Sequence, residues 1–122
     1  MYKSIALLKC KPGLTREQFV DYYENCHVPL VRSLLPEICG YRRNFIDPDG
    51  AFVGPACAER DFDVITEIWY ADRAAYDSAM ARHARPEIGG RISADEENFL
   101  DRSRIRMFVV EEHVSDFGTA AG

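Results

Sequence analysis

The sequence lacks any apolar run long enough to cross a bilayer as a helix. Its first residues, MYKSIALLKCK, are too few and too polar for a secretory signal peptide. We therefore expect a cytoplasmic protein that is not associated with a membrane.

The chain also lacks concentrated positive charge. It has 15 Lys and Arg against 20 Asp and Glu, a net charge of −5, and the basic residues are scattered. Proteins that bind nucleic acid present a clustered basic face, so we expect no such partner. A phosphate-binding glycine loop and a haem-attachment motif are missing as well. The sequence therefore predicts no cofactor.

The four cysteines, Cys10, Cys26, Cys39 and Cys57, are widely spaced and include no C-x-x-C pair. This spacing favours neither a zinc site nor a redox dithiol. Cys10 and Cys26 fall at expected core positions of a strand and a helix, where a free cysteine acts as a small apolar residue. We expect reduced, mostly buried thiols and no metal site.

What the 122 residues do contain is the pattern of one α+β domain. Strands are predicted at 2–11, 38–46, 64–70 and 105–112, with helices at 15–35 and 72–83 and a short acidic helix opened by a capping box at 93–96. This β-α-β-β-α-β order predicts a ferredoxin-like, four-stranded antiparallel sheet. We expect the domain to span residues 1–114, a flexible tail to span 115–122, and 47–63 to be a long loop.

The helices of such a fold cover one face of the sheet only. The strand at 2–11 is apolar on both faces, so the other face needs a cover of its own. A second copy of the same sheet, related by a two-fold axis, is the simplest cover. The sequence therefore predicts a homodimer.

The first helix is the most informative stretch. Thr15 and Gln18 form a capping box, and Phe19, Tyr23, Cys26, Leu30 and Leu34 follow with helical spacing. Pro29 lacks an N–H, so a kink or break is expected around 25–28. His27 then faces inward beside that break. It is either a catalytic group or a buried histidine satisfied by a backbone carbonyl.

These elements resemble a known family. The block KPGLTREQFVDYYENCHVPL, the E-x-W of the strand at 64–70 and the late block DEENFLDRSRIRMFVVEEH are similar to the EthD-domain family, part of the dimeric α/β-barrel superfamily. The resemblance implies a pocket between helices and sheet in each subunit. It leaves the reaction open: such proteins are associated with ether degradation alongside an oxygenase, fungal relatives look like dehydratases or decarboxylases, and related barrels include cyclases and monooxygenases. The long loop at 47–63 departs from the family pattern.

His27 matches the histidine of the family's H-x-P-L block and is the expected general acid or base. Tyr23, one turn earlier, is a candidate donor to an enolate oxygen, or alternatively a core tyrosine. Asp101 is expected to orient the imidazole or to bind Arg104, or alternatively to lie on a solvated helix face. The remaining candidate substrate-binding residues are Phe19, Tyr22, Glu67, Trp69, Asp95, Phe99 and Phe108. For Glu67 an ion pair with Lys or Arg is the alternative, and for His83 a structural role is expected.

The sequence-based hypothesis is a cofactor-independent enzyme of lyase type, catalysing dehydration, decarboxylation or cyclisation of an aromatic or polyketide-like molecule. One alternative is an oxidoreductase or an oxygenase-associated protein of ether or aromatic degradation. The other is a dimeric binding or accessory protein without turnover.

Overall fold

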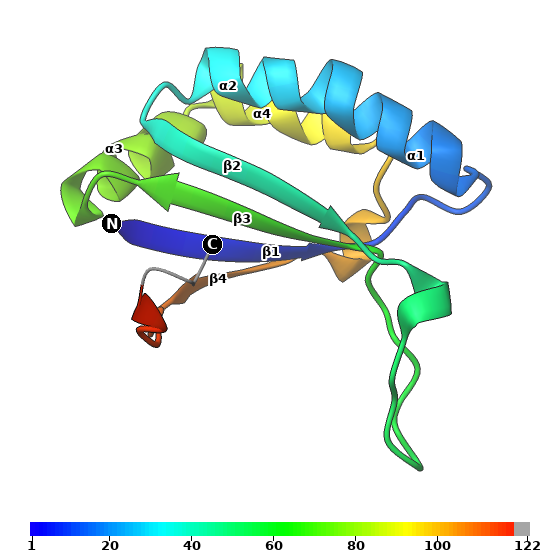
Figure 1. The fold of residues 1–122 in the computed structure, drawn as a ribbon. Helices are drawn as coiled ribbons and strands as arrows, with labels where there is room; N and C mark the ends of the chain where they lie inside the picture. The colour runs from blue at the N-terminus through cyan, green and yellow to red at the C-terminus, as the bar shows by residue number, and fades with distance from the viewer. Residues whose placement is uncertain (119–122) are drawn as a thin grey trace.

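A computed structural model describes residues 1–118 and has the predicted strand order. Strands β1 (Tyr2–Leu8), β2 (Ile38–Phe45), β3 (Val64–Tyr70) and β4 (Arg106–Val110) form one antiparallel sheet in the order β2-β3-β1-β4. The helices α1 (Arg16–Tyr22), α2 (Val28–Leu34) and α4 (Pro86–Glu96) cross one face of this sheet, and α3 (Arg73–His83) lies at one end (Figure 1). This is the ferredoxin-like α+β fold that the sequence predicts.

The first helical stretch begins with the predicted capping box, in which the Thr15 and Gln18 side chains each accept the other's backbone N–H. It is interrupted by one π-helical turn, η1 (Tyr23–His27), in which the Val28 N–H bonds to the Tyr23 carbonyl. This turn lies at the predicted break before Pro29 and adds one residue to the helical repeat.

The extra residue changes which side chains face the sheet. Phe19 and Tyr23 are buried as expected, but His27, Val31 and Leu35 follow them into the core in place of the predicted Cys26, Leu30 and Leu34. The prediction of a buried Cys26 was therefore wrong, because a strict 3.6-residue period does not survive a π turn. The four cysteines are free thiols; only Cys10 is partly buried, and the other three are exposed.

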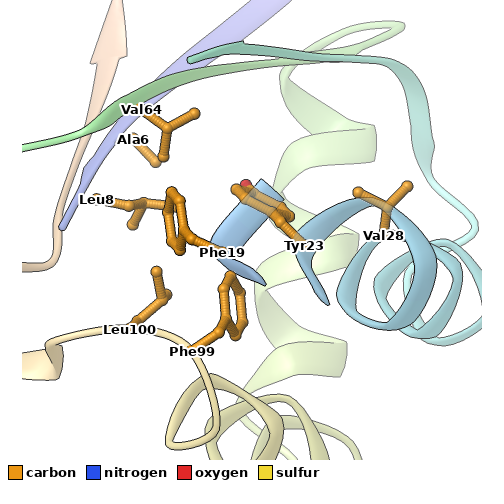
Figure 2. Close-up of a cluster of buried hydrophobic side chains, with 8 residues drawn as sticks. All are labelled: Ala6, Leu8, Phe19, Tyr23, Val28, Val64, Phe99 and Leu100. Atoms are coloured by element: carbon orange, nitrogen blue, oxygen red, sulfur yellow. The ribbon is translucent and has the colours of Figure 1, made fainter. Parts of the chain in front are cut away.

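The main core lies between the first helix and the sheet. Phe19 and Tyr23 from the helices meet Phe99 in the segment after α4, and strand side chains close the cluster from the sheet side (Figure 2). The Phe19 and Phe99 ring centroids are 5.9 Å apart, and those of Tyr23 and Phe99 are 5.2 Å apart. The aromatic cluster fixes the end of α4 against the π turn.

Helix α4 differs from its prediction. The expected short helix with a capping box at Ser93 is instead an eleven-residue helix that begins at Pro86, with Ser93 inside it. Proline suits the first helical position, where its missing N–H is not needed. Gly89 allows the close contact with α3, because a Cβ there would collide with the His83 carbonyl oxygen. The glycine that suggested an interruption is thus a packing requirement.

The predicted loop at 47–63 extends away from the body of the molecule (Figure 1). It contains the short 3-10 turn η2 (Pro48–Gly50), and its Phe52 side chain is 97% exposed. A second short turn, η3 (Arg102–Arg104), precedes β4. Of the predicted tail 115–122, residues 119–122 lie outside the described residues. Within residues 1–118, no helix combines the length and the apolar character needed to span a bilayer.

Candidate active site

The candidate active site is a cavity of about 150 Å³ between the helices and the inner face of the sheet. Most of its wall is apolar, from Leu8 and Ile68 of the sheet to Val31 and Ile92 of the helices. Its polar wall consists of a small set of groups: Tyr23, His27, Tyr41, Thr66, Tyr70, His83 and Glu96. An apolar pocket with a few convergent polar groups is the usual form of a small-molecule site.

His27 is held in this wall by a carboxylate. Its Nδ1 lies 2.8 Å from Oδ2 of Asp95, and the residue is only 4% exposed. The other Asp95 oxygen accepts a hydrogen bond of 2.6 Å from the Tyr22 hydroxyl, which in turn accepts one from the Asn98 amide. No hydrogen bond from the described residues reaches Nε2 of His27. The ring is therefore fixed at one nitrogen and free at the other.

Burial lowers the pKa of His27, and the hydrogen bond and charge of Asp95 oppose this effect only in part. The imidazole is therefore neutral at physiological pH. With Asp95 accepting the proton on Nδ1, the lone pair of the ring is on Nε2. This is the tautomer that a general base requires.

Hydroxyl groups line the strand side of the cavity. The Tyr23 and Thr66 oxygens are 2.7 Å apart and share one hydrogen bond, which leaves one O–H of the pair available to a ligand. Burial raises the pKa of both Tyr23 and Tyr41, so both phenols keep their protons at neutral pH. The cavity thus offers hydrogen-bond donors opposite apolar surface.

The structure separates the predicted site residues into three groups. His27 and Tyr23 line the cavity, whereas Phe19, Tyr22, Asp95 and Phe99 stand behind it in the core or in the hydrogen-bond network. Glu67, Trp69 and Phe108 lie on the outer face of the sheet, where Ile5 pairs with both Glu67 and Phe108. These last three residues cannot contact a ligand in the cavity of their own subunit.

The predicted role of Asp101 also differs from the geometry. Its carboxylate accepts hydrogen bonds from the backbone N–H and hydroxyl of Ser103 and caps η3, and Asp95 is the carboxylate that contacts His27. Glu67 forms the ion pair that was its alternative, at 2.8 Å from Lys3 Nζ. Among the described residues, no three His, Cys, Asp or Glu side chains converge to hold a metal ion.

Sequence reasoning missed Tyr41, Thr66 and Glu96. Side chains of a strand alternate between the two faces of a sheet, and Tyr41 and Thr66 are each next to an outer-face residue of β2 or β3. This alternation would have assigned both to the helix side if the outer face had been known. Glu96 follows Asp95 at the end of α4. The sequence predicted that this helix begins near Ser93, so the face on which the Glu96 side chain lies could not be assigned.

The EthD domain family profile matches residues 11–103, and the chain therefore belongs to the EthD family. Solved structures share the fold. An EthD family protein from Bacillus halodurans is 24% identical, with a TM-score of 0.61, over 93% of this chain and 100% of the other. HapK from Hahella chejuensis is 15% identical, with a TM-score of 0.61, over 98% and 99%. A hydroxynitrile lyase from Passiflora edulis is 14% identical, with a TM-score of 0.50, over 93% and 96%. No curated protein matches at a significant level.

Proposed function

We propose that this protein is a cofactor-independent enzyme of lyase type in which Nε2 of His27 is the general base. The observation that carries the proposal is the 2.8 Å contact between His27 Nδ1 and Asp95 in the wall of an apolar cavity. A neutral imidazole oriented by a carboxylate accepts a proton from an acidic C–H or O–H group of a bound molecule.

The wall indicates the class of substrate. No Lys or Arg is among the residues that line the cavity, and Glu96 is its one carboxyl group. An anionic substrate would lie there without a counter-charge, so the substrate is uncharged. A cavity of about 150 Å³ encloses one ring of roughly the size of benzene, and because it is partly open to solvent, the rest of a bound molecule can extend out of it. We infer a neutral substrate with one aromatic ring and an oxygen atom.

The hydroxyl groups complete the proposed chemistry. When His27 removes a proton next to a carbonyl group, negative charge develops on the carbonyl oxygen. The pair of Tyr23 and Thr66, together with Tyr41, supplies protonated donors on the same wall. Elimination of a leaving group then follows from the enolate. A hydroxynitrile lyase with this fold supports the assignment to the lyase class.

We also infer that the protein is a homodimer through the outer face of the sheet. Ile5, Leu7, Ile65, Trp69 and Phe108 place apolar surface on that face, and Phe108 is 51% exposed. A protein from Thermobifida fusca with this fold is described as dimeric; it is 14% identical, with a TM-score of 0.50. A second sheet packed on this face would bury its apolar residues.

The base can be tested without the natural substrate. Benzisoxazoles are small, neutral aromatic molecules that open to cyanophenols when a base removes their C–H proton. We expect the protein to bind the nitro-substituted compound and accelerate its opening, and His27→Gln to lower the rate roughly 10²–10⁴-fold. His83→Gln is the matched control, because His83 lines the same cavity without a carboxylate partner. Binding without elimination would identify a binding protein, and an unchanged His27→Gln rate would overturn the proposal.

A further inference from the structure

Helix α4 directs two consecutive carboxyl groups to different parts of the site. Asp95 contacts His27 on the side away from the cavity, and Glu96 lines the cavity itself. His27 and Glu96 are therefore two proton-carrying groups in one wall, and only one of them has a carboxylate partner. Of these two groups, the proposed function gives a role only to His27.

The surroundings of Glu96 do not explain it as a structural residue. Its side chain is only 19% exposed, and no described residue donates a hydrogen bond to its carboxyl group. Arg102 is the nearest cation, with Nε 3.7 Å from Oε1, beyond hydrogen-bond distance. Arg102 instead donates a hydrogen bond of 3.0 Å from Nη1 to Glu97. A carboxyl group in an apolar wall without a hydrogen bond is costly to stability, which favours a functional reason for its presence.

We propose that Glu96 is the catalytic general acid that protonates the leaving group in the elimination for which His27 removes the substrate proton. The proposal rests on the proposed function of His27. In the elimination the C–H electron pair becomes the new π bond, and the bond to the leaving oxygen breaks. His27 Nε2 gains one proton and Glu96 loses one, so the charges balance. Transfer of a proton back from His27 to Glu96 restores the enzyme.

The charged groups around Glu96 support this protonation state. Burial raises the pKa of Glu96, Arg102 opposes that effect, and the neighbouring Asp95 and Glu97 add to it. Burial lowers the pKa of His27 in the same cavity. The environment thus moves the acid and the base in opposite directions, which is the arrangement that acid–base catalysis needs. The other titratable side chains of this wall are three tyrosines and one histidine. Burial raises the pKa values of Tyr23, Tyr41 and Tyr70, so these phenols stay protonated, and His83 is exposed at the end of α3.

Two benzisoxazoles separate the roles of the two groups. In both compounds the C–H bond and the N–O bond break and a nitrile forms, so no co-reactant is needed. The nitro-substituted compound releases a stable phenolate that needs no acid, whereas the unsubstituted compound releases a basic phenolate that benefits from protonation. We expect Glu96→Gln to slow the unsubstituted compound roughly 10²–10⁴-fold and to leave the nitro compound within about tenfold. Glu87→Gln is the control: Glu87 is on the same helix, in its first turn, with a side chain that is 60% exposed and paired with Arg85, and its substitution should change neither rate.

The outcomes distinguish the two proposals. If His27→Gln loses activity on both compounds and Glu96→Gln slows both by the same small factor, His27 is the base and Glu96 is not the acid. Absence of elimination in the unmodified protein overturns both. If Glu96→Gln does not fold, the pH dependence of the unmodified protein decides. The rate on the unsubstituted compound must fall as pH rises through the pKa of Glu96, and the rate on the nitro compound must not. Identical profiles overturn the proposal.

Discussion

Asp95 and His27 are 68 residues apart in the sequence, and their side chains meet at 2.8 Å across the end of α4 and the π turn. The aromatic packing of Phe99 on the His27 ring, at 4.8 Å between centroids, supports this contact from the core side. Because Asp95 also accepts a hydrogen bond from Tyr22, its carboxylate has a fixed direction. The orientation of the ring therefore depends on a second residue that does not contact the cavity.

Asp95→Asn tests this orientation. The amide can donate to Nδ1 and so favour the tautomer with its proton on Nε2, which has no free base toward the cavity. We expect the rate of benzisoxazole opening to fall roughly 10²–10⁴-fold with little loss of folding. Nitrogen chemical shifts of the His27 ring report the tautomer. Asp101→Asn is the control, because Asp101 caps η3 and does not contact the ring; an equal loss there would contradict the assigned role of Asp95.

The order of strands and helices along the chain and the inward direction of His27 were predictable because they depend on local signals. Alternating strands, the Thr15 capping box and the position of Pro29 each have a near-neighbour cause. The register beyond the break was not predictable. Whether a helix accommodates a proline with a kink or with a π turn depends on the packing of Tyr23 and His27 against the sheet, which only the tertiary structure provides.

The sequence also could not assign the side chains of the strands to the inner or the outer face of the sheet. Both faces of β1 and β3 carry large apolar side chains, so periodicity alone could not assign Trp69 and Phe108 to the outer face. For the same reason Tyr41 and Thr66 could not be assigned to the inner face and so to the cavity. Glu96 was hidden for a different reason, because Pro86, Gly89 and Gly90 suggested an interruption where the structure has a continuous helix.

The buried His27 should make stability depend on pH. Its pKa in the folded protein lies below the ordinary value of about 6.5, so the unfolded chain binds more protons between these two values. Stability therefore rises with pH through that window and is lost as the pH falls. In His27→Gln this contribution is absent. Thermal unfolding of both proteins between pH 4.5 and 8 measures this contribution: the melting temperature of the unmodified protein should rise relative to that of His27→Gln as the pH increases through that window. A difference in melting temperature that does not change with pH would contradict the lowered pKa.

The dimer prediction concerns Phe108 on the outer face. Phe108→Lys places a charge in the centre of the proposed interface, and burial of an unpaired charge there is unfavourable. We expect light scattering to change from twice the chain mass to the single chain mass at micromolar concentration. Ala81→Lys, on the exposed side of α3, should leave the dimer intact. A monomeric unmodified protein would refute the interface.

The free thiols provide a direct check of the register beyond the π turn. Cys26, Cys39 and Cys57 are exposed, so a thiol reagent should modify them rapidly in the folded protein. Burial raises the pKa of Cys10 above its ordinary value, and its reaction should be slower. Mass spectrometry of timed samples measures each site. Slow modification of Cys26, equal to that of Cys10, would place it in the core as a regular helix does and would contradict the π turn. Added reductant should leave the melting temperature unchanged, since no disulfide joins the four thiols.

Glu96→Gln should make the protein more stable even though it impairs catalysis. The raised pKa of Glu96 means that the folded state binds its proton more tightly than the unfolded chain does. Stability therefore decreases as the pH rises from the ordinary carboxyl pKa through the raised one, and the full cost is present above both values.

The glutamine side chain has the same shape and no charge, so it removes that cost. We expect a gain of about 1–2 kcal/mol at pH 8, near the lower range for a buried polar group without a hydrogen bond, and no gain at pH 3.5. Chemical denaturation at the two pH values measures both numbers. Glu97→Gln, whose side chain is 65% exposed, should change stability by less than ~0.5 kcal/mol at either pH. If Glu96 were retained for structure, its substitution would destabilise the protein. A lower stability of Glu96→Gln at pH 8 would therefore show that the carboxylate is structural and that its contact with Arg102, at 3.7 Å, stabilises the fold.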